Sequence, residues 1–179
     1  LETKKLKKTI QISSIGFVVF YTTAALLYPK FFNPTKLFFC DLMQIRIGTE
    51  DSFNKGLPFA LLALLSISTV IAAFFIWFTN QTEWSNNKKK FKKIYGSSAA
   101  VFTSFIFTEL HDEFILIASI IGGLPVTFVA LEILKSRYKN APVLGLISFL
   151  FLAFYNFSFY LNIFESVWPL MQKMSITLC

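Results

Sequence analysis

Long uncharged stretches, rich in apolar side chains, alternate with short charged stretches along the chain. Five of the uncharged stretches stand out, with 21, 27, 15, 18 and 25 residues between their flanking charges. About 20 mostly apolar residues cross the ~30 Å hydrocarbon core of a bilayer as a helix, whereas an isolated strand leaves its backbone unpaired in lipid. The pattern therefore predicts an all-α, polytopic membrane bundle with five spans, over about 9–29, 57–79, 94–110, 114–132 and 141–164.

The third span is the shortest of the five, and it reaches sufficient length only if Glu109 to Asp112 lie at the membrane boundary. Spans three and four then form a helical hairpin with an acidic, histidine-containing tip. Residues 166–179 form an amphipathic segment, which is either an interfacial helix or the start of a sixth span that the end of the chain truncates. All of 1–179 is thus expected to form one integral membrane domain, with a long outward loop, 30–55, between the first two spans.

Composition supports a membrane protein and excludes several other classes. Of the 179 residues, 55% are hydrophobic and only 15% are charged, and the mean hydropathy is +0.60. An average soluble domain is about 25% charged, and a globule of this size cannot bury so large an apolar excess. The 23 Phe, 7 Gly and 2 Cys are also untypical of disordered, collagen-like and disulfide-stapled proteins.

Lysine and arginine residues are distributed unevenly between the two sides of the predicted bundle. Twelve lie in the N-terminus, the 80–93 loop and the 132–140 loop, and five lie in the segments on the other side. Since cytoplasmic segments carry the excess of Lys and Arg, the N-terminus is predicted to be cytoplasmic, in the inner or plasma membrane of a bacterial-type cell. No aromatic recognition module accompanies the lysine run at 88–93, so membrane lipids, and not nucleic acids, are its expected partners.

The outward loop carries Asp41 within an apolar stretch, 36–44. That stretch is apolar enough to lie in the interface or to re-enter the membrane between helices, and a carboxylate there requires a partner or a proton. Asp41 is therefore a helix N-cap, an ion-pair partner of Arg46 or part of a functional site. The neighbouring Cys40 is interpreted as a small apolar residue, because the chain contains no Cys-x-x-Cys.

A second polar cluster, Glu109-Leu110-His111-Asp112-Glu113, places three carboxylates and the only histidine within five residues. Ionisable groups near the membrane boundary are candidates for function. Three interpretations stay open: a solvated turn, a proton-handling or ligand-binding site shared with Asp41, and a mixed His/carboxylate metal site. One histidine is too few for a three-histidine zinc site and no His-x-x-x-His is present, so no metal and no cofactor is predicted.

Two features inside the predicted spans concern helix packing and transport. Gly122-Gly123-Leu124-Pro125 in the fourth span can break the helix, as at the midplane sites of transporters, or can allow close packing with a mild kink. Close packing is the favoured interpretation, and the small residues at 96–100 of the third span suit it. Asn156 in the fifth span is expected to face protein, as a contact between helices or as the wall of a cavity.

The order of several short motifs suggests a family. These motifs are a basic N-terminus, Cys40-Asp41-Leu42, Asn54-Lys55-Gly56-Leu57-Pro58 at the second span, and Leu110-His111-Asp112 between spans three and four. In this order the chain resembles an uncharacterised bacterial family of multi-pass membrane proteins, classified as a domain of unknown function. The resemblance implies about six helices and marks Asp41 and His111 as candidate positions, but it implies no particular reaction.

The sequence contains no enzyme signature, and Gly-x-Ser-x-Gly in particular is absent. We expect a non-enzymatic membrane protein that binds a lipid, a small amphipathic ligand or a partner at an outward-facing polar site formed by Asp41, Glu109, His111, Asp112 and Asn156. One alternative is a membrane-embedded hydrolase or transferase acting on a lipid headgroup, with His111 as general base and Asp41 or Asp112 orienting it. The other is a small transporter with a broken fourth helix.

Overall fold

The computed structural model of the chain describes residues 2–47, 52–135 and 140–178. Parts of the outward loop, 48–51, and of the 132–140 loop, 136–139, therefore lie outside the described residues. The described elements are α1 (Glu2–Leu26), η1 (Cys40–Met43), β1 (Arg46–Ile47), β2 (Ser52–Phe53), α2 (Leu57–Gln81), α3 (Asn86–Thr103), α4 (His111–Leu134), α5 (Ala141–Tyr160), η2 (Glu165–Val167) and α6 (Trp168–Leu178). The predicted all-α class is confirmed. The only described sheet is the antiparallel pair of β1 and β2, with two residues in each strand.

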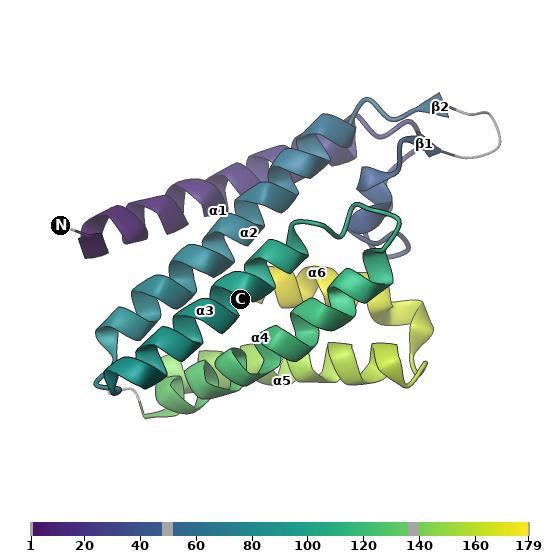
Figure 1. Cartoon of the computed structure of the whole chain (residues 1–179). Coiled ribbons are helices and arrows are strands. Elements are labelled where there is room, and N and C mark those ends of the chain that lie inside the picture. The colour runs from purple at the N-terminus through teal and green to yellow at the C-terminus, as the bar shows by residue number, and fades with distance from the viewer. Residues whose placement is uncertain (1, 48–51, 136–139, 179) are drawn as a thin grey trace.

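The first five α-helices run back and forth between two ends of an elongated bundle (Figure 1). Each packs on the next one along the chain, so that α3 lies between α2 and α4. The N-terminus, the α2–α3 connection and the C-terminal end of α4 meet at one end, which we call the lysine-rich end (Figure 1). The segments 27–47, 52–56, 104–110 and 161–167 lie at the other, which we call the loop end (Figure 1).

Four of the described helices are long and apolar enough to cross a membrane: α1, α2, α4 and, over Pro142–Tyr160, α5. The helix α3 does not reach this standard, because five of its first eight residues are lysines. A fifth span through α3 therefore stays a prediction, as does the cytoplasmic location of the lysine-rich end. Successive helices run in opposite directions, so the N-terminus, the α2–α3 connection and the C-terminal end of α4 lie at the same end (Figure 1). A common side for the lysine-rich segments requires this arrangement.

The third helix differs from its predicted range of 94–110. It begins at Asn86, so all five lysines assigned to the 80–93 loop lie in its first turns, as suits a residue with good helix propensity. It ends at Thr103, where the hydroxyls of Thr103 and Ser104 donate to the carbonyls of Ala99 and Ala100, at 2.9 and 3.1 Å. Such bonds compete with helix continuation, and residues 104–108 form single turns.

The outward loop folds over the loop end of α1 and α2. Phe39, Leu42, Met43 and Ile47 are buried there against apolar residues of α1 and α2, such as Ala24. The apolar stretch at 36–44 is thus covered by the protein's own helices, and its 3₁₀ turn and the hairpin that follows it were not predicted. These buried contacts hold the described part of the loop against the end of α1.

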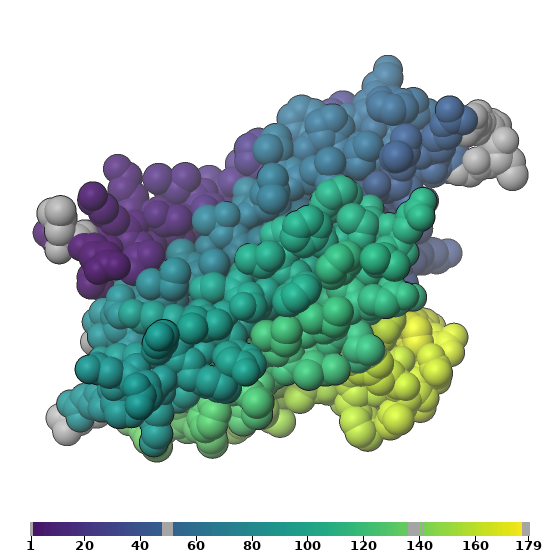
Figure 2. Space-filling view, viewed as in Figure 1, coloured from purple at the N-terminus to yellow at the C-terminus, as the bar shows by residue number. Residues whose placement is uncertain are grey.

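The predicted amphipathic C-terminal segment is a short helix, α6, which follows the left-handed residue Phe164 and the turn η2. It packs on α5. The lime-to-yellow part of the chain, toward its C-terminal end, lies at the loop end beside α4 (Figure 2). With 11 residues, the described helix is shorter than a membrane span.

The fourth helix is continuous through Gly122–Pro125. A Cβ atom added at Gly122 would lie 3.1 Å from the Cβ of Ala99 on α3, so this glycine allows close packing of the two helices. The favoured interpretation of this motif is confirmed. The transporter alternative required a broken fourth helix, and this continuous helix lacks that feature.

Candidate functional site

Asp41 lies in the 3₁₀ turn of the outward loop, where its carboxylate is occupied locally. Oδ2 accepts the Phe38 backbone N–H at 2.6 Å, and Oδ1 accepts Nε2 of Gln44 at 3.2 Å. Asp41 lies inside this turn, whose N-cap residue is Phe39, so it is not the helix N-cap that the sequence left open as one interpretation.

His111 and Asp112 form a pair at the start of α4. Nδ1 of His111 lies 2.8 Å from Oδ1 of Asp112, whose side chain is 85% exposed, and Glu109 is also exposed. Nε2 of His111 is buried and has no hydrogen-bond partner among the described residues. A carboxylate at Nδ1 favours the tautomer that leaves Nε2 as a proton acceptor. The polar contacts of Asp41 and those of His111 involve different partners, so they do not form one hydrogen-bonded cluster.

Asn156 connects two helices, as predicted for an amide inside the bundle. Its Oδ1 accepts the Ser119 hydroxyl of α4 at 3.3 Å, and its Nδ2 donates to the Leu152 carbonyl at 2.8 Å. The side chain is therefore satisfied by protein groups. Across the described part of the chain, no three His, Cys, Asp or Glu side chains gather where they could hold a metal ion.

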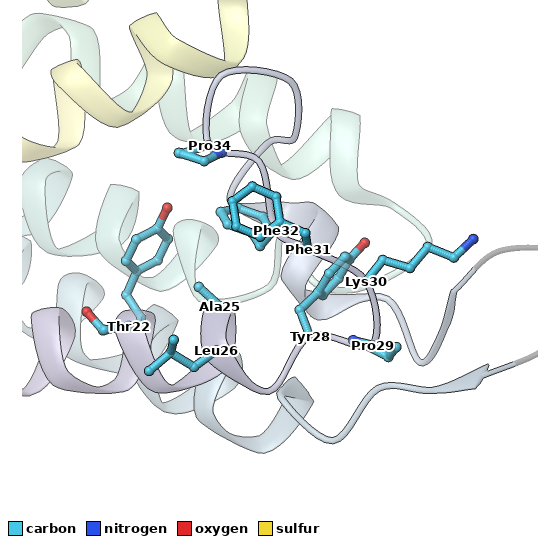
Figure 3. Close-up of a pocket in the computed structure, with 10 residues that line it drawn as sticks. Thr22, Ala25, Leu26, Tyr28, Pro29, Lys30, Phe31, Phe32 and Pro34 are labelled. Atoms are coloured by element: carbon cyan, nitrogen blue, oxygen red, sulfur yellow. The ribbon is translucent and has the colours of Figure 1, made fainter.

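An apolar cavity of about 450 Å³ lies at the loop end of α1, and we call it the α1 pocket. Side chains of α1 and of the segment that follows it face the same space, and the Lys30 side chain extends away from them (Figure 3). Phe31 lines the pocket yet is 88% exposed. The complete lining is Tyr21, Thr22, Ala25, Leu26, Tyr28, Pro29, Lys30, Phe31, Phe32 and Pro34.

Charged groups act on the aromatic wall of this pocket. Burial raises the pKa of Tyr28, and the charge of Asp41 raises it further. Nζ of Lys173 lies 5.5 Å from the centre of the Phe32 ring. The same ammonium group donates to the backbone carbonyls of Leu37 and Pro169. The site is thus a mostly apolar space with Lys30 in its lining, Lys173 beside that lining and Asp41 acting on it.

The contribution of α6 was not predicted from the sequence. Oε1 of Gln172 accepts the Phe39 backbone N–H at 2.7 Å, so that α6 fixes the outward loop from the far end of the chain. The only available signal was a Gln172-Lys173 pair in an otherwise apolar segment. A separation of more than 130 residues gives no indication that this pair meets the loop.

The environment of Lys173 predicts unusual amine reactivity. Burial lowers the pKa of Lys173 to about 8, although the charges of Asp41 and Cys40 act to raise it. Acetic anhydride labelling over a range of pH, quantified by peptide mass spectrometry, should therefore give a midpoint near 8, below the ~10.4 of ordinary lysines. Asp41→Asn should lower this midpoint further, while Asp112→Asn serves as the control and leaves it in place. A midpoint that Asp41→Asn does not move would contradict the assignment.

The same pKa has a consequence for stability. A lysine binds its proton less tightly in the folded chain than in the unfolded chain, so the unfolded chain holds more protons between about pH 8 and about pH 10.4. Folding stability should therefore rise with pH through this window.

Cys40 behaves differently, because burial and the charge of Asp41 raise its pKa to about 12. Its thiol should stay protonated and react slowly with maleimide at pH values where Lys173 has lost its proton.

Comparison with known proteins adds no family to these observations. A scan against protein-family models, a search of the curated proteins and a search of the solved structures each find no match to this chain. The family resemblance inferred from the sequence motifs therefore stays a prediction, and the function is argued from the site alone.

Proposed function

We propose that this protein is a non-enzymatic integral membrane protein that binds an amphipathic ligand, a membrane phospholipid, in the α1 pocket. The observation that carries the proposal is an apolar, aromatic-lined cavity of about 450 Å³ at the end of a helix long and apolar enough to span the membrane. A mostly apolar cavity with a few polar groups at its edge is the usual form of a site for a small hydrophobic molecule. The proposed site is an outward-facing, ligand-binding site, as expected from the sequence. It differs from that expectation in being centred on α1.

The lining of the pocket suits the two parts of such a ligand. Leu26 and Phe31 are strongly exposed at the end of α1, where an acyl chain in the bilayer could contact them. Tyr28 and Lys30 supply a hydroxyl and an ammonium group at the edge, in the positions where amphipathic side chains meet lipid headgroups. Asp41, from the predicted set of site residues, acts electrostatically on Tyr28 and so contributes charge to this polar edge.

Two substitutions in the pocket test the proposal with purified protein in detergent. Phe31→Ala removes an exposed aromatic contact, and Ala25→Phe fills the space from α1. With added palmitoyl-oleoyl phosphatidylethanolamine, native mass spectrometry should show about tenfold less bound lipid for Phe31→Ala, as expected for the loss of one aromatic contact. Ala25→Phe should reduce binding at least as much.

Phe53→Ala is the matched control, because Phe53 is an exposed phenylalanine at the same end of the molecule but outside the pocket. It should bind the lipid as the unchanged protein does. Melting temperatures in detergent identify any variant that has lost its fold. Equal lipid binding by all three folded variants would overturn the proposal.

A further inference from the structure

A second cavity, of about 530 Å³, lies at the lysine-rich end of the bundle, and we call it the basic pocket. It lies between the first turns of α3 and the last turns of α4. Its lining is Trp84, Asn87, Lys88, Phe91, Lys92, Phe128, Leu131, Glu132 and Lys135. Three ammonium groups and one carboxylate thus share a cavity that also has aromatic walls.

Lys92 forms the inner wall of the basic pocket. Only 5% of the residue is exposed, and its Nζ lies 2.9 Å from the centre of the Trp84 ring and 4.2 Å from that of Phe128. Both rings offer their negative faces to the ammonium group and hold it in place. A positive charge fixed at the base of a cavity is unusual, since long lysine side chains commonly extend into water.

The single carboxylate of the pocket is already engaged. Oε2 of Glu132 accepts Nε1–H of Trp84 at 3.3 Å and lies 3.6 Å from Nζ of Lys135. Burial lowers the pKa of Lys92, and the charges of Lys88 and Lys135 lower it further, while Glu132 raises it. The lysines are thus close enough to repel one another. One carboxylate among three ammonium groups leaves an excess of two positive charges.

The position of the cavity indicates what kind of anion would balance this charge. The pocket lies beside the C-terminal end of α4, a helix long and apolar enough to span the membrane, with Trp84 in the position typical of the membrane–water interface. Basic pockets between helices at this depth suit lipid headgroups. The first turn of α3 also lines the cavity, and the positive end of its helix dipole adds to the field.

We infer that the basic pocket binds the phosphate group of an anionic phospholipid. In this site Lys88 and Lys135 contact the phosphate from the rim, and Lys92 supplies the fixed charge beneath it. Phe91 and Leu131 provide the apolar contact for the start of the acyl chains. This site is separate from the α1 pocket at the loop end and does not depend on it.

A charge-matched pair of double variants tests this inference in detergent. Lys88→Gln with Lys135→Gln removes the two rim charges, both of which are exposed, so the fold should not depend on them. Lys4→Gln with Lys90→Gln removes two exposed lysines at the same end that do not line the cavity. The unchanged protein and each double variant are mixed with phosphatidylglycerol, phosphatidylcholine, phosphatidylethanolamine or inorganic phosphate, and the bound species are counted by native mass spectrometry.

The unchanged protein should retain phosphatidylglycerol in preference to phosphatidylcholine. The rim variant should lose about 30-fold of that preference, from about a fivefold effect for each lysine, and the control should keep it. An equal loss in both variants would show nonspecific attraction and would overturn the inference. Inorganic phosphate that displaces the lipid and binds as well as the lipid does would show a site for free anions. This result would also overturn the inference. Unchanged binding of phosphatidylethanolamine by the rim variant separates this result from the α1 pocket.

Discussion

Replacement of Asn54 by aspartate is expected to destabilise the protein by about 3–5 kcal/mol. Asn54 is fully buried at the start of α2, and its Nδ2 donates to the carbonyls of Leu42 and Gln44 at 2.8 and 2.9 Å. Its Oδ1 accepts the Gly56 backbone N–H at 2.9 Å. Aspartate has nearly the same shape but no donor, so a buried carboxylate would face two carbonyl oxygens.

The loss should appear in two measurements. The melting temperature in detergent should fall strongly, and the outward loop should separate from α2, because Asn54 joins the 3₁₀ turn to the start of that helix. Cys40 lies in this turn and should then react with maleimide much faster than in the unchanged protein. An Asn54→Asp protein with an unchanged melting temperature and slow Cys40 labelling would contradict this account.

Asn33→Asp is the matched control within the same loop. Oδ1 of Asn33 accepts the N–H and the hydroxyl of Thr35, at 3.0 and 2.8 Å, so both bonds use the side chain as an acceptor. Aspartate keeps these bonds and lies in a more exposed place. Asn33→Asp should therefore melt close to the unchanged protein, which would show that the effect at Asn54 comes from the lost donors and not from added charge.

The sequence predicted the helices well because lipid imposes one strong requirement on them. Long uncharged stretches in a chain with little charge leave few alternatives to membrane helices, and α2, α4 and α5 begin within a few residues of their predicted starts. The prediction failed where charge alone was used to set a boundary. Lysines do not end a helix, so α1 includes Lys4 to Lys8, and α3 includes the run from Lys88 to Lys93.

The candidate sites were harder to predict, because they depend on contacts between distant segments. Asp41 stood out as a charged residue in an apolar stretch, yet its carboxylate makes local hydrogen bonds to Phe38 and Gln44. In the sequence Asn54 is only part of a motif at the second span, and nothing there indicates that its side chain holds the loop in place. Both pockets contain several aromatic and lysine side chains, which are common over the whole chain, and only the packing of α1, α3 and α4 shows which of them meet.

Substitution of Gly96 by leucine is expected to be the second most damaging change, at about 3 kcal/mol or more. A Cβ atom at Gly96 would lie 2.2 Å from Cγ of Phe75, whose residue is only 4% exposed in the contact between α2 and α3. The ring has no free space to enter, so the two helices would have to separate. Gly123→Leu is the control, because no other side chain or distant backbone atom lies within 4 Å of a Cβ at Gly123. It should melt at or above the temperature of the unchanged protein, since leucine also favours the helix over glycine.

The damage at Gly96 should extend to the basic pocket, because Lys92 lies one helical turn before Gly96 on α3. Displacement of α3 would move the Lys92 ammonium group away from the Trp84 and Phe128 rings, and the preference for phosphatidylglycerol should fall together with the melting temperature. A second substitution, Phe75→Ala, makes room for the leucine and should restore both quantities in part, as contacting residues couple in double-mutant cycles. If Phe75→Ala merely adds its own destabilisation to that of Gly96→Leu, the result would contradict this explanation. The clash with Phe75 would then not be the reason that position 96 requires a glycine.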